Sequence, residues 1–192
     1  EFRKKLNTYA KYGQKTFKQL IDTAQLENAR IVRATEMASL YIENLGDGKF
    51  VKHYLPVEMQ FAPVFGMLAA YVDDDEHLDL LAVGNDYSAE KITGNYDASL
   101  GMCLLGDGQG KFKPLRSNEF IVKGDAKGLA ALTTKNGNTF YLATQNQDSL
   151  VVYKKLKKAA GMITLEPTDA FATLYYEDGS RRKHEFYYGS GY

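Results

Sequence analysis

The densest group of chemically active side chains is a run of carboxylates near the middle of the chain. Its members are Asp73, Asp74, Asp75, Glu76 and Asp79. Acid/base hydrolysis of a glycoside or phosphoester needs two carboxylates in different environments, one of them held protonated by burial. Consecutive Asp residues in a polar loop are expected to be solvated and ionised together, and His77 needs a distant partner to act as a base. A metal-dependent hydrolase that uses Asp73, Asp75 and Asp79 is therefore the alternative, not the leading, interpretation.

A second candidate site is a polar segment with two tyrosines, residues 85–98, called the tyrosine loop below. Its candidate ligand-binding residues are Asn85, Asp86, Tyr87, Asn95, Tyr96 and Asp97. An exposed tyrosine ring offers apolar area, and neighbouring Asn and Asp side chains offer directed hydrogen bonds, which suits a sugar or a protein loop. Two interpretations stay open: the two tyrosines contact a ligand, or they pack the loop against its own sheet.

Other familiar chemistries find no support in the residue types or their spacing. Cys103 is the single cysteine and lies in an apolar run, so a buried strand residue is expected. His53, His77 and His184 are far apart and lack a second His or Cys at zinc-ligand spacing. The sequence has no Ser nucleophile elbow and no Walker loop, and residues 106–110 are expected to form a turn between two strands.

The overall charge gives no reason to expect a nucleic-acid or membrane partner. The 192 residues carry 24 Lys+Arg and 24 Asp+Glu, and no run reaches the ~18 apolar residues of a spanning helix or the core of a signal peptide. We therefore predict no transmembrane segment and no nucleic-acid binding. The first 20 residues are basic through Arg3, Lys4, Lys5, Lys11, Lys15 and Lys18. These form either a docking surface for acidic partners or phosphate, or the solvated face of an amphipathic helix.

The elements that must position these residues are a helical beginning and a long β region. Apolar residues recur at helical spacing over residues 2–30, with Gly13 as an interruption, which predicts two or three short helices. From Ile31 onward, runs rich in β-branched, aromatic and Leu residues alternate with Gly, Asp and Asn. Strands are expected near residues 37–43, 49–55, 64–71, 78–84, 99–105, 111–115, 127–133, 138–144, 149–155, 171–176 and 181–188. Tight hairpin turns are expected at Asp47-Gly48, Asp107-Gly108, Asn136-Gly137 and Asp178-Gly179.

The β region repeats itself at an interval of about 60 residues. The segment from Ser39-Leu40 to Leu45-Gly46-Asp47-Gly48 recurs as Ser99-Leu100 to Leu105-Gly106-Asp107-Gly108. The pairs Leu81-Ala82 and Leu142-Ala143, Asn85 and Asn146, and Gly66 and Gly128 agree with it. Four-stranded propeller blades are built from units of about 40 to 50 residues, and an extended loop lengthens the unit. The repeat therefore predicts propeller-like sheets.

On these residues the chain resembles the FG-GAP/VCBS repeat proteins. Their blades run from an aspartate-rich loop through a Leu-Asp-Leu strand and a Gly-Asn end to a strand closing on Gly-Asp-Gly-x-Phe, and residues 72–85 and 104–112 follow that order. Residues 172–192 are similar to the ASPIC/UnbV segment that often closes such propellers. The resemblance covers about residues 37–192 and implies a bacterial protein with an extracellular, periplasmic or cell-surface location.

The resemblance implies calcium as the candidate cofactor of residues 71–79, called the acidic loop below. In that family the loop often binds calcium through alternating oxygen ligands, which places Asp73, Asp75 and Asp79 at the third, fifth and ninth positions. Two residues depart from the pattern. Tyr71 has no carboxylate for the first position, and Glu76 stands where Gly makes the sharp turn, at a cost of about 1 kcal/mol. The open alternative is a solvated loop whose Asp side chains cap backbone N–H groups.

The expected architecture is mainly β, a partial β-propeller of about two and a half four-stranded blades with an N-terminal helical segment. The expected parts are helical residues 1–32, blades 33–160 with a contribution from the C-terminal hairpin to the last sheet, and a hairpin segment 161–192. Such an array cannot close a ring, so the remaining blades must come from a longer chain or a second copy. The expected function is a non-enzymatic recognition or scaffold module that binds protein or glycan through its loops.

Overall fold

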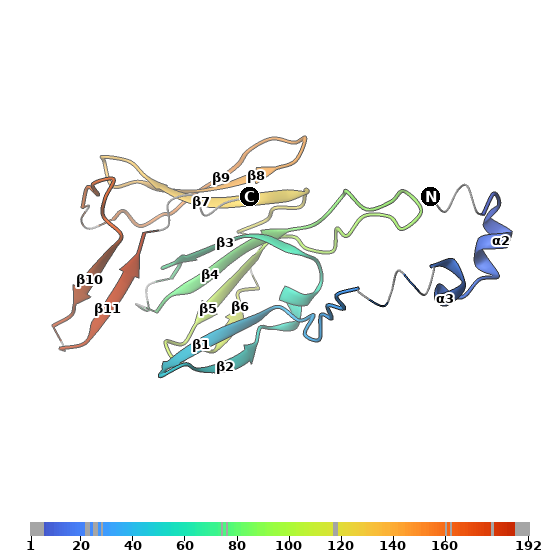
Figure 1. Ribbon diagram of the computed structural model, residues 1–192. Helices are drawn as coiled ribbons and strands as arrows, with labels where there is room; N and C mark the ends of the chain where they lie inside the picture. Colours follow the sequence, from blue (N-terminus) through green and yellow to red (C-terminus); the bar gives the residue numbers. More distant parts are fainter. Residues whose placement is uncertain are drawn as a thin grey trace. The chain divides into compact units, whose positions relative to one another are not determined.

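The computed structural model of the chain divides into two units, Glu1–Met37 and Ala38–Tyr192. It describes residues 6–21, 24, 27, 29–73, 75, 77–116, 119–159, 161, 163–177 and 179–186. The described part of the first unit contains two short helices, and the second unit consists of strands in antiparallel sheets (Figure 1). The prediction of a mainly β chain is confirmed.

The helices of the first unit are α2 (Tyr9–Gly13) and α3 (Phe17–Leu20). The Thr8 hydroxyl accepts a hydrogen bond from the Lys11 N–H at 3.3 Å, and the Gln19 side chain accepts one from the Thr16 N–H at 3.0 Å. These contacts satisfy N–H groups that a helix leaves unpaired at its start. The prediction of short helices interrupted at Gly13 is confirmed, and no helix in the described part of the chain is long and apolar enough to cross a membrane.

The strands of the second unit lie close to the predicted runs. They are β1 (Leu40–Gly46), β2 (Lys49–Tyr54), β3 (Val64–Ala70), β4 (Asp79–Gly84), β5 (Met102–Gly106), β6 (Phe112–Pro114), β7 (Ala126–Thr133), β8 (Thr139–Gln145), β9 (Val151–Lys154), β10 (Phe171–Tyr175) and β11 (Arg181–Glu185). A short 3-10 helix, η1 (Val57–Gln60), joins β2 to β3. Every predicted strand run is therefore found, with ends shifted by up to three residues.

Antiparallel pairing arranges these strands in four sheets, β1-β2, β3-β4-β5-β6, β7-β8-β9 and β10-β11. Asp47 and Gly48 both adopt positive φ, 51° and 73°, in the turn between β1 and β2. That conformation is what a two-residue hairpin turn needs and what Asp-Gly supplies at little cost. Gly108, Gly137 and Gly179 also have positive φ in the turns predicted for them.

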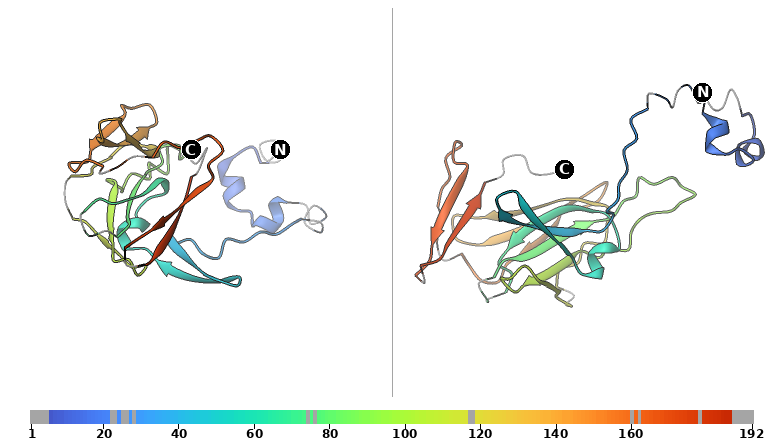
Figure 2. Two further views of the ribbon diagram at one scale, coloured as in Figure 1. Left: turned by 90° about the vertical axis from the view of Figure 1, so that its left-hand side faces the viewer. Right: turned by 60° about the horizontal axis from the view of Figure 1, so that its bottom comes forward.

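The C-terminal hairpin differs from its prediction. Within the described residues, β10 and β11 pair only with each other, so they do not complete the β7-β8-β9 sheet. Figure 2 shows this hairpin as a separate two-stranded ribbon. Arg182 of β11 donates from Nη1 to the Tyr71 hydroxyl at 2.5 Å. This side-chain contact joins the hairpin to the acidic loop.

The core lies between the sheets β3–β6 and β7–β9, which face each other in Figures 1 and 2. Leu81 and Cys103 of the first sheet pack with Tyr141 of the second. The backbones approach each other closely at Gly66, where an added Cβ would lie 2.8 Å from the backbone nitrogen of Leu129. Glycine is therefore required at this contact because any side chain would separate the two sheets. The opposite face of β3–β6 packs around Met59 of η1.

Two of the sheets share a local backbone feature at corresponding positions of the sequence repeat. A β-bulge lies between Val64 and Gly66 in β3 and between the corresponding residues Ala126 and Gly128 in β7. A bulge increases the local twist of its strand, so β3 and β7 share this one feature at corresponding residues.

A carboxamide clamp repeats as well. Asn85 accepts a hydrogen bond from the Ser99 N–H at 3.0 Å and donates one to the Ser99 carbonyl at 2.8 Å. Gln60 makes the same pair of bonds with Ser39, at 2.7 and 2.9 Å. Ser39 and Ser99 were expected to be equivalent, and both occupy the same kind of backbone environment ahead of their strands.

Candidate functional site

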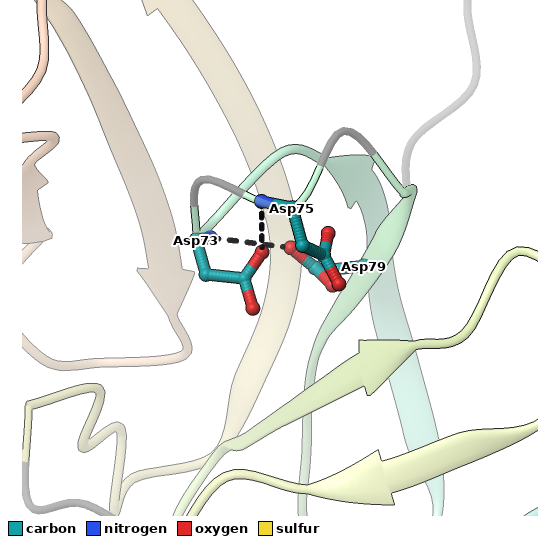
Figure 3. A group of neighbouring side chains, drawn as sticks. All are labelled: Asp73, Asp75 and Asp79. Atoms are coloured by element: carbon teal, nitrogen blue, oxygen red, sulfur yellow. Dashed lines mark hydrogen bonds between the residues drawn. The ribbon is translucent and has the colours of Figure 1, made fainter.

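The acidic loop joins β3 to β4 and brings three carboxylates together. One oxygen from each of Asp73, Asp75 and Asp79 lies within 4.8 Å of the others, and Figure 3 shows the side chains turned toward a common point. The structure therefore unites the three residues that the sequence selected. Asp74 and Glu76, including the turn expected at Glu76, lie outside the described residues.

Asp79 differs from the expected solvated carboxylate because it is 1% exposed. Its Oδ2 accepts hydrogen bonds from the N–H groups of Val72 at 2.6 Å and Asp73 at 3.4 Å. Its Oδ1 accepts a hydrogen bond from the N–H of Gly106 at 3.0 Å. Asp79 therefore ties the start of the acidic loop to the end of β5, which satisfies the rule that a buried charge needs several donors.

Asp73 and Asp75 shape the loop through local bonds. Asp73 Oδ1 accepts from the Asp75 N–H at 3.2 Å, and Asp75 Oδ1 accepts from the His77 N–H at 2.9 Å. Each is an Asx turn, the arrangement expected for the alternative in which Asp side chains cap the backbone. Burial raises the pKa of Asp73 above its usual value, and the neighbouring charges of Asp79 and Asp75 add to the rise.

The chemistry open to this cluster is oxygen ligation of a hard cation. Asp73 and Asp75 keep oxygen lone pairs beyond those used by the backbone, and calcium takes carboxylate oxygens in flexible geometry. Acid/base hydrolysis needs a partner base, but the His77 ring lies against the turn between β5 and β6. A Cβ built on Gly108 would lie 2.5 Å from its Nδ1. The geometry therefore favours ligation over proton transfer.

Cys103 offers no reactive thiol. It lies in β5 and is buried, as the sequence predicted, and burial raises its pKa to about 11, with a further contribution from the charge of Asp79. A thiol with that pKa is protonated at neutral pH and is a poor nucleophile or metal ligand.

The tyrosine loop extends beyond the end of the β3–β6 sheet (Figure 1) and has a rigid base. Asp86 and Tyr96 form a paired bridge in which each N–H donates to the other's carbonyl at 2.9 Å. The Asp86 carboxylate accepts from the Ser88 hydroxyl at 2.6 Å and from the Ser88 N–H at 2.9 Å, and these bonds lower the pKa of Asp86. The two ends of the loop are thus fixed while its tip is exposed.

The candidate residues of this loop fall into two groups. Asn85 is fully buried, and its amide also donates to the carbonyls of Lys123 and Gly124 at 3.1 Å. Its role is therefore structural, because it joins the end of β4 to the segment before β7. Tyr87 is 43% exposed, and its hydroxyl lies 3.5 Å from the Lys123 carbonyl. Tyr96 is 51% exposed, with exposed Asn95 and Asp97 beside it. The Tyr87 hydroxyl thus contacts the segment that precedes β7, and Tyr96 has the more exposed ring.

No family model, curated protein or solved structure matches this chain.

Lys127 is a residue near the tyrosine loop that the sequence analysis missed. Its ammonium lies 2.7 Å from Asp125, 3.8 Å from Asp86 and 3.7 Å from the centre of the Phe65 ring. It also donates to the Asn85 carbonyl at 3.2 Å. The signal was a lysine in the predicted apolar strand 127–133, where a cation is retained only if acidic partners surround it.

Proposed function

We propose that the second unit is part of a β-propeller-like array and that the chain is a non-enzymatic recognition or scaffold module. The four-stranded meander β3-β4-β5-β6, the equal bulges of β3 and β7, and the face-to-face packing of successive sheets support the array. Loops on a rigid scaffold are where binding residues concentrate. The resemblance to exported repeat proteins supports a location at the cell surface or outside the cytoplasm.

The main support for a binding role is the structure of the tyrosine loop, which has a fixed base and exposed side chains. Its base is fixed by the Asp86–Tyr96 bridge, so little conformational freedom is lost when a ligand reaches it. The half-exposed ring of Tyr96 supplies apolar area, and the exposed polar groups of Asn95 and Asp97 supply directed hydrogen bonds. This combination suits the face of a sugar ring or a protein loop.

The test is binding of the full chain to a panel of immobilised oligosaccharides and of extracellular protein domains. A specific ligand should bind, and Tyr96→Ala should weaken it at least about tenfold, the size of an interface hot spot. Tyr175→Ala, which removes a 78% exposed ring from β10, is the matched control and should leave binding unchanged. Equal binding by the folded Tyr96→Ala variant would show that the tyrosine loop is not the site.

A second candidate comes from the acidic loop, because Asp73, Asp75 and Asp79 converge. We propose calcium as the cation, with metal-dependent hydrolysis as the catalytic alternative. Calcium at 100 times its Kd would add about 2.7 kcal/mol to the free energy of unfolding. Its addition should therefore raise the Tm of the wild type and of Asp148→Asn, a change in an exposed aspartate elsewhere, but not that of Asp75→Asn.

Hydrolysis is tested separately with a chromogenic phosphodiester and a glycoside panel in the presence of calcium. Turnover that disappears in Asp75→Asn would favour the hydrolase over the binding module. A Tm that does not respond to millimolar calcium, together with no turnover, would leave the three aspartates as backbone caps.

A further inference from the structure

The side of the β7–β9 sheet that faces away from β3–β6 is apolar. We call it the outer β7–β9 face, and it consists of Ala130, Leu132, Phe140, Leu142 and Val152. Leu132 is 53% exposed and Val152 is 51% exposed. The members on β7 and β9 are exposed, and Phe140 and Leu142 between them on β8 are partly exposed. A contiguous apolar patch of this kind is typical of an interaction site.

Comparison with the equivalent residues of the β3–β6 sheet indicates what the outer β7–β9 face binds. Leu68, Leu81 and Cys103 lie opposite one another across β3, β4 and β5, and the equivalent row across β7, β8 and β9 is Ala130, Leu142 and Val152. The first row is covered by the next sheet, which leaves Leu81 2% exposed and Cys103 7% exposed. The second row has the same position in its sheet without that cover. It is therefore built to receive another sheet.

The β1–β2 hairpin presents the opposite kind of face. Ile42 and Phe50, on one side of the hairpin, correspond through the repeat to Met102 and Phe112. Met102 is 8% exposed because Met59, from the segment that follows β2, covers it. Ile42 and Phe50 are 54% and 61% exposed. The outer β1–β2 face, defined by these two residues, is thus of the kind that lies under a preceding sheet.

We propose that the outer β7–β9 face of one copy of the chain docks on the outer β1–β2 face of a second copy. The chain already makes this kind of contact internally, once where Tyr41 of β1 meets Phe112 of β6 with ring centroids 6.1 Å apart, and once between β3–β6 and β7–β9. The contact joins two different surfaces, so it produces rings where the rotation closes and open chains where it does not. This proposal concerns assembly and does not involve the tyrosine loop.

The charges on these faces predict a salt response. Lys52 lies on the same side of its hairpin as Ile42, and Lys154 lies on the same side of its sheet as Val152. Both are exposed. Salt screens the repulsion between like charges, so added salt should strengthen an association driven by the apolar residues.

The test is sedimentation velocity of the full chain at concentrations from about 1 to 200 µM, the range in which weak interfaces are populated. The sedimentation coefficient of the wild type should rise with concentration. Val152→Lys and Ile42→Lys should each remain monomeric, and an equimolar mixture of the two should form dimers and nothing larger, because each supplies one intact face. Ile92→Lys, a change in a 92% exposed apolar residue of the tyrosine loop, is the control and should assemble like the wild type.

Three results would overturn the proposal. A wild type that stays monomeric throughout means that another partner, not a second copy, covers the two faces. Assembly that survives both lysine variants places the contact elsewhere. A mixture that remains monomeric shows that the two faces do not bind each other. Loss of ligand binding in Tyr96→Ala with assembly intact keeps the two proposals separate.

Discussion

The two sheets β3–β6 and β7–β9 share a bulge in their first hairpin and differ in their surroundings. Both begin with a bulged hairpin, but within the described residues only the first continues into a fourth strand and has both faces covered. Neighbouring sheets therefore decide which apolar side chains of each sheet are buried and stabilise the fold. Equivalent residues in the two sheets are therefore natural matched pairs for mutation.

The loops at the same end of the two sheets also differ. Asp79 begins β4 and binds three backbone N–H groups, whereas the equivalent turn between β7 and β8 is closed by a hydrogen bond of 3.0 Å between the hydroxyls of Thr133 and Thr139. Both solutions hold a loop to its sheet. Only the first leaves carboxylate oxygens for a cation, so any metal chemistry belongs to one repeat and not to the fold.

The largest expected difference is between Leu81→Ala and Leu142→Ala. Leu81 is 2% exposed between two sheets, so its truncation leaves a cavity and should lower the free energy of unfolding by about 2–5 kcal/mol. Leu142 occupies the equivalent place on the outer β7–β9 face and is only partly buried, so its truncation should cost about 1 kcal/mol or less. Urea unfolding at low micromolar concentration, where we expect the chain to be monomeric, measures both.

Assembly should change the stability cost of one of these two variants and not of the other. At high concentration the cost of Leu142→Ala should grow, because docking of a second copy buries the residue, while that of Leu81→Ala stays unchanged. Equal costs for the two variants at low concentration would mean that the outer face is already covered within the chain, which contradicts the comparison.

A smaller difference is expected between Gly66→Ala and Gly128→Ala. A Cβ on Gly66 would lie 2.8 Å from a backbone nitrogen of the facing sheet, which cannot move without separating the sheets, so a loss of about 1–3 kcal/mol is expected. A Cβ on Gly128 would meet only the Thr144 hydroxyl at 3.0 Å, and that side chain can rotate. We expect Gly128→Ala to cost less than about 1 kcal/mol. Thermal unfolding of both variants checks this, and a reversed order would show that β3 and β7 do not meet as described.

Local patterns in the sequence were sufficient to locate the strands and the acidic loop. Alternating apolar residues and Asp-Gly turns act over a few residues, which is why β1 to β11 were all anticipated. The burial of Asp79 was not, because it depends on the Gly106 N–H, 27 positions away. The inward role of Asn85 and the cluster around Lys127 depend on segments 38 to 42 positions away. The burial and the partners of these residues depend on contacts between distant segments, which leave no periodic signal in the sequence.

The separate pairing of β10 with β11 was missed for a related reason. Period-two alternation predicts a strand but does not specify the edge to which it pairs. A hydrogen bond from the hairpin to the acidic loop joins Arg182 to Tyr71, a pair separated by 111 positions. Neither residue type at either position distinguishes that contact from a solvated side chain.

The smallest expected effect is that of Asp73→Asn, which sharpens the contrast between the acidic loop and its threonine counterpart. A raised pKa means that folding disfavours the ionised form, so the contribution of Asp73 to stability is fully present below its ordinary pKa of 3.8 and is lost as pH rises through the folded value. Asparagine keeps the Oδ1 acceptor for the Asp75 N–H without the charge. The variant should therefore be slightly more stable than the wild type at pH 7 without cations, by less than about 3 °C in Tm, and the gain should vanish near pH 3.

Calcium reverses the sign of that comparison. A bound cation favours the ionised carboxylate, so the wild type should gain stability and Asp73→Asn should gain less. Asp148→Asn is the control in both conditions. A variant that is less stable than the wild type at pH 7 without any cation would mean that the Asp73 charge is already favourably paired. In that case the cluster is a structural network that needs no cation. In an unfilled cation site, by contrast, the repulsion between the carboxylates lowers the stability of the protein until a cation binds.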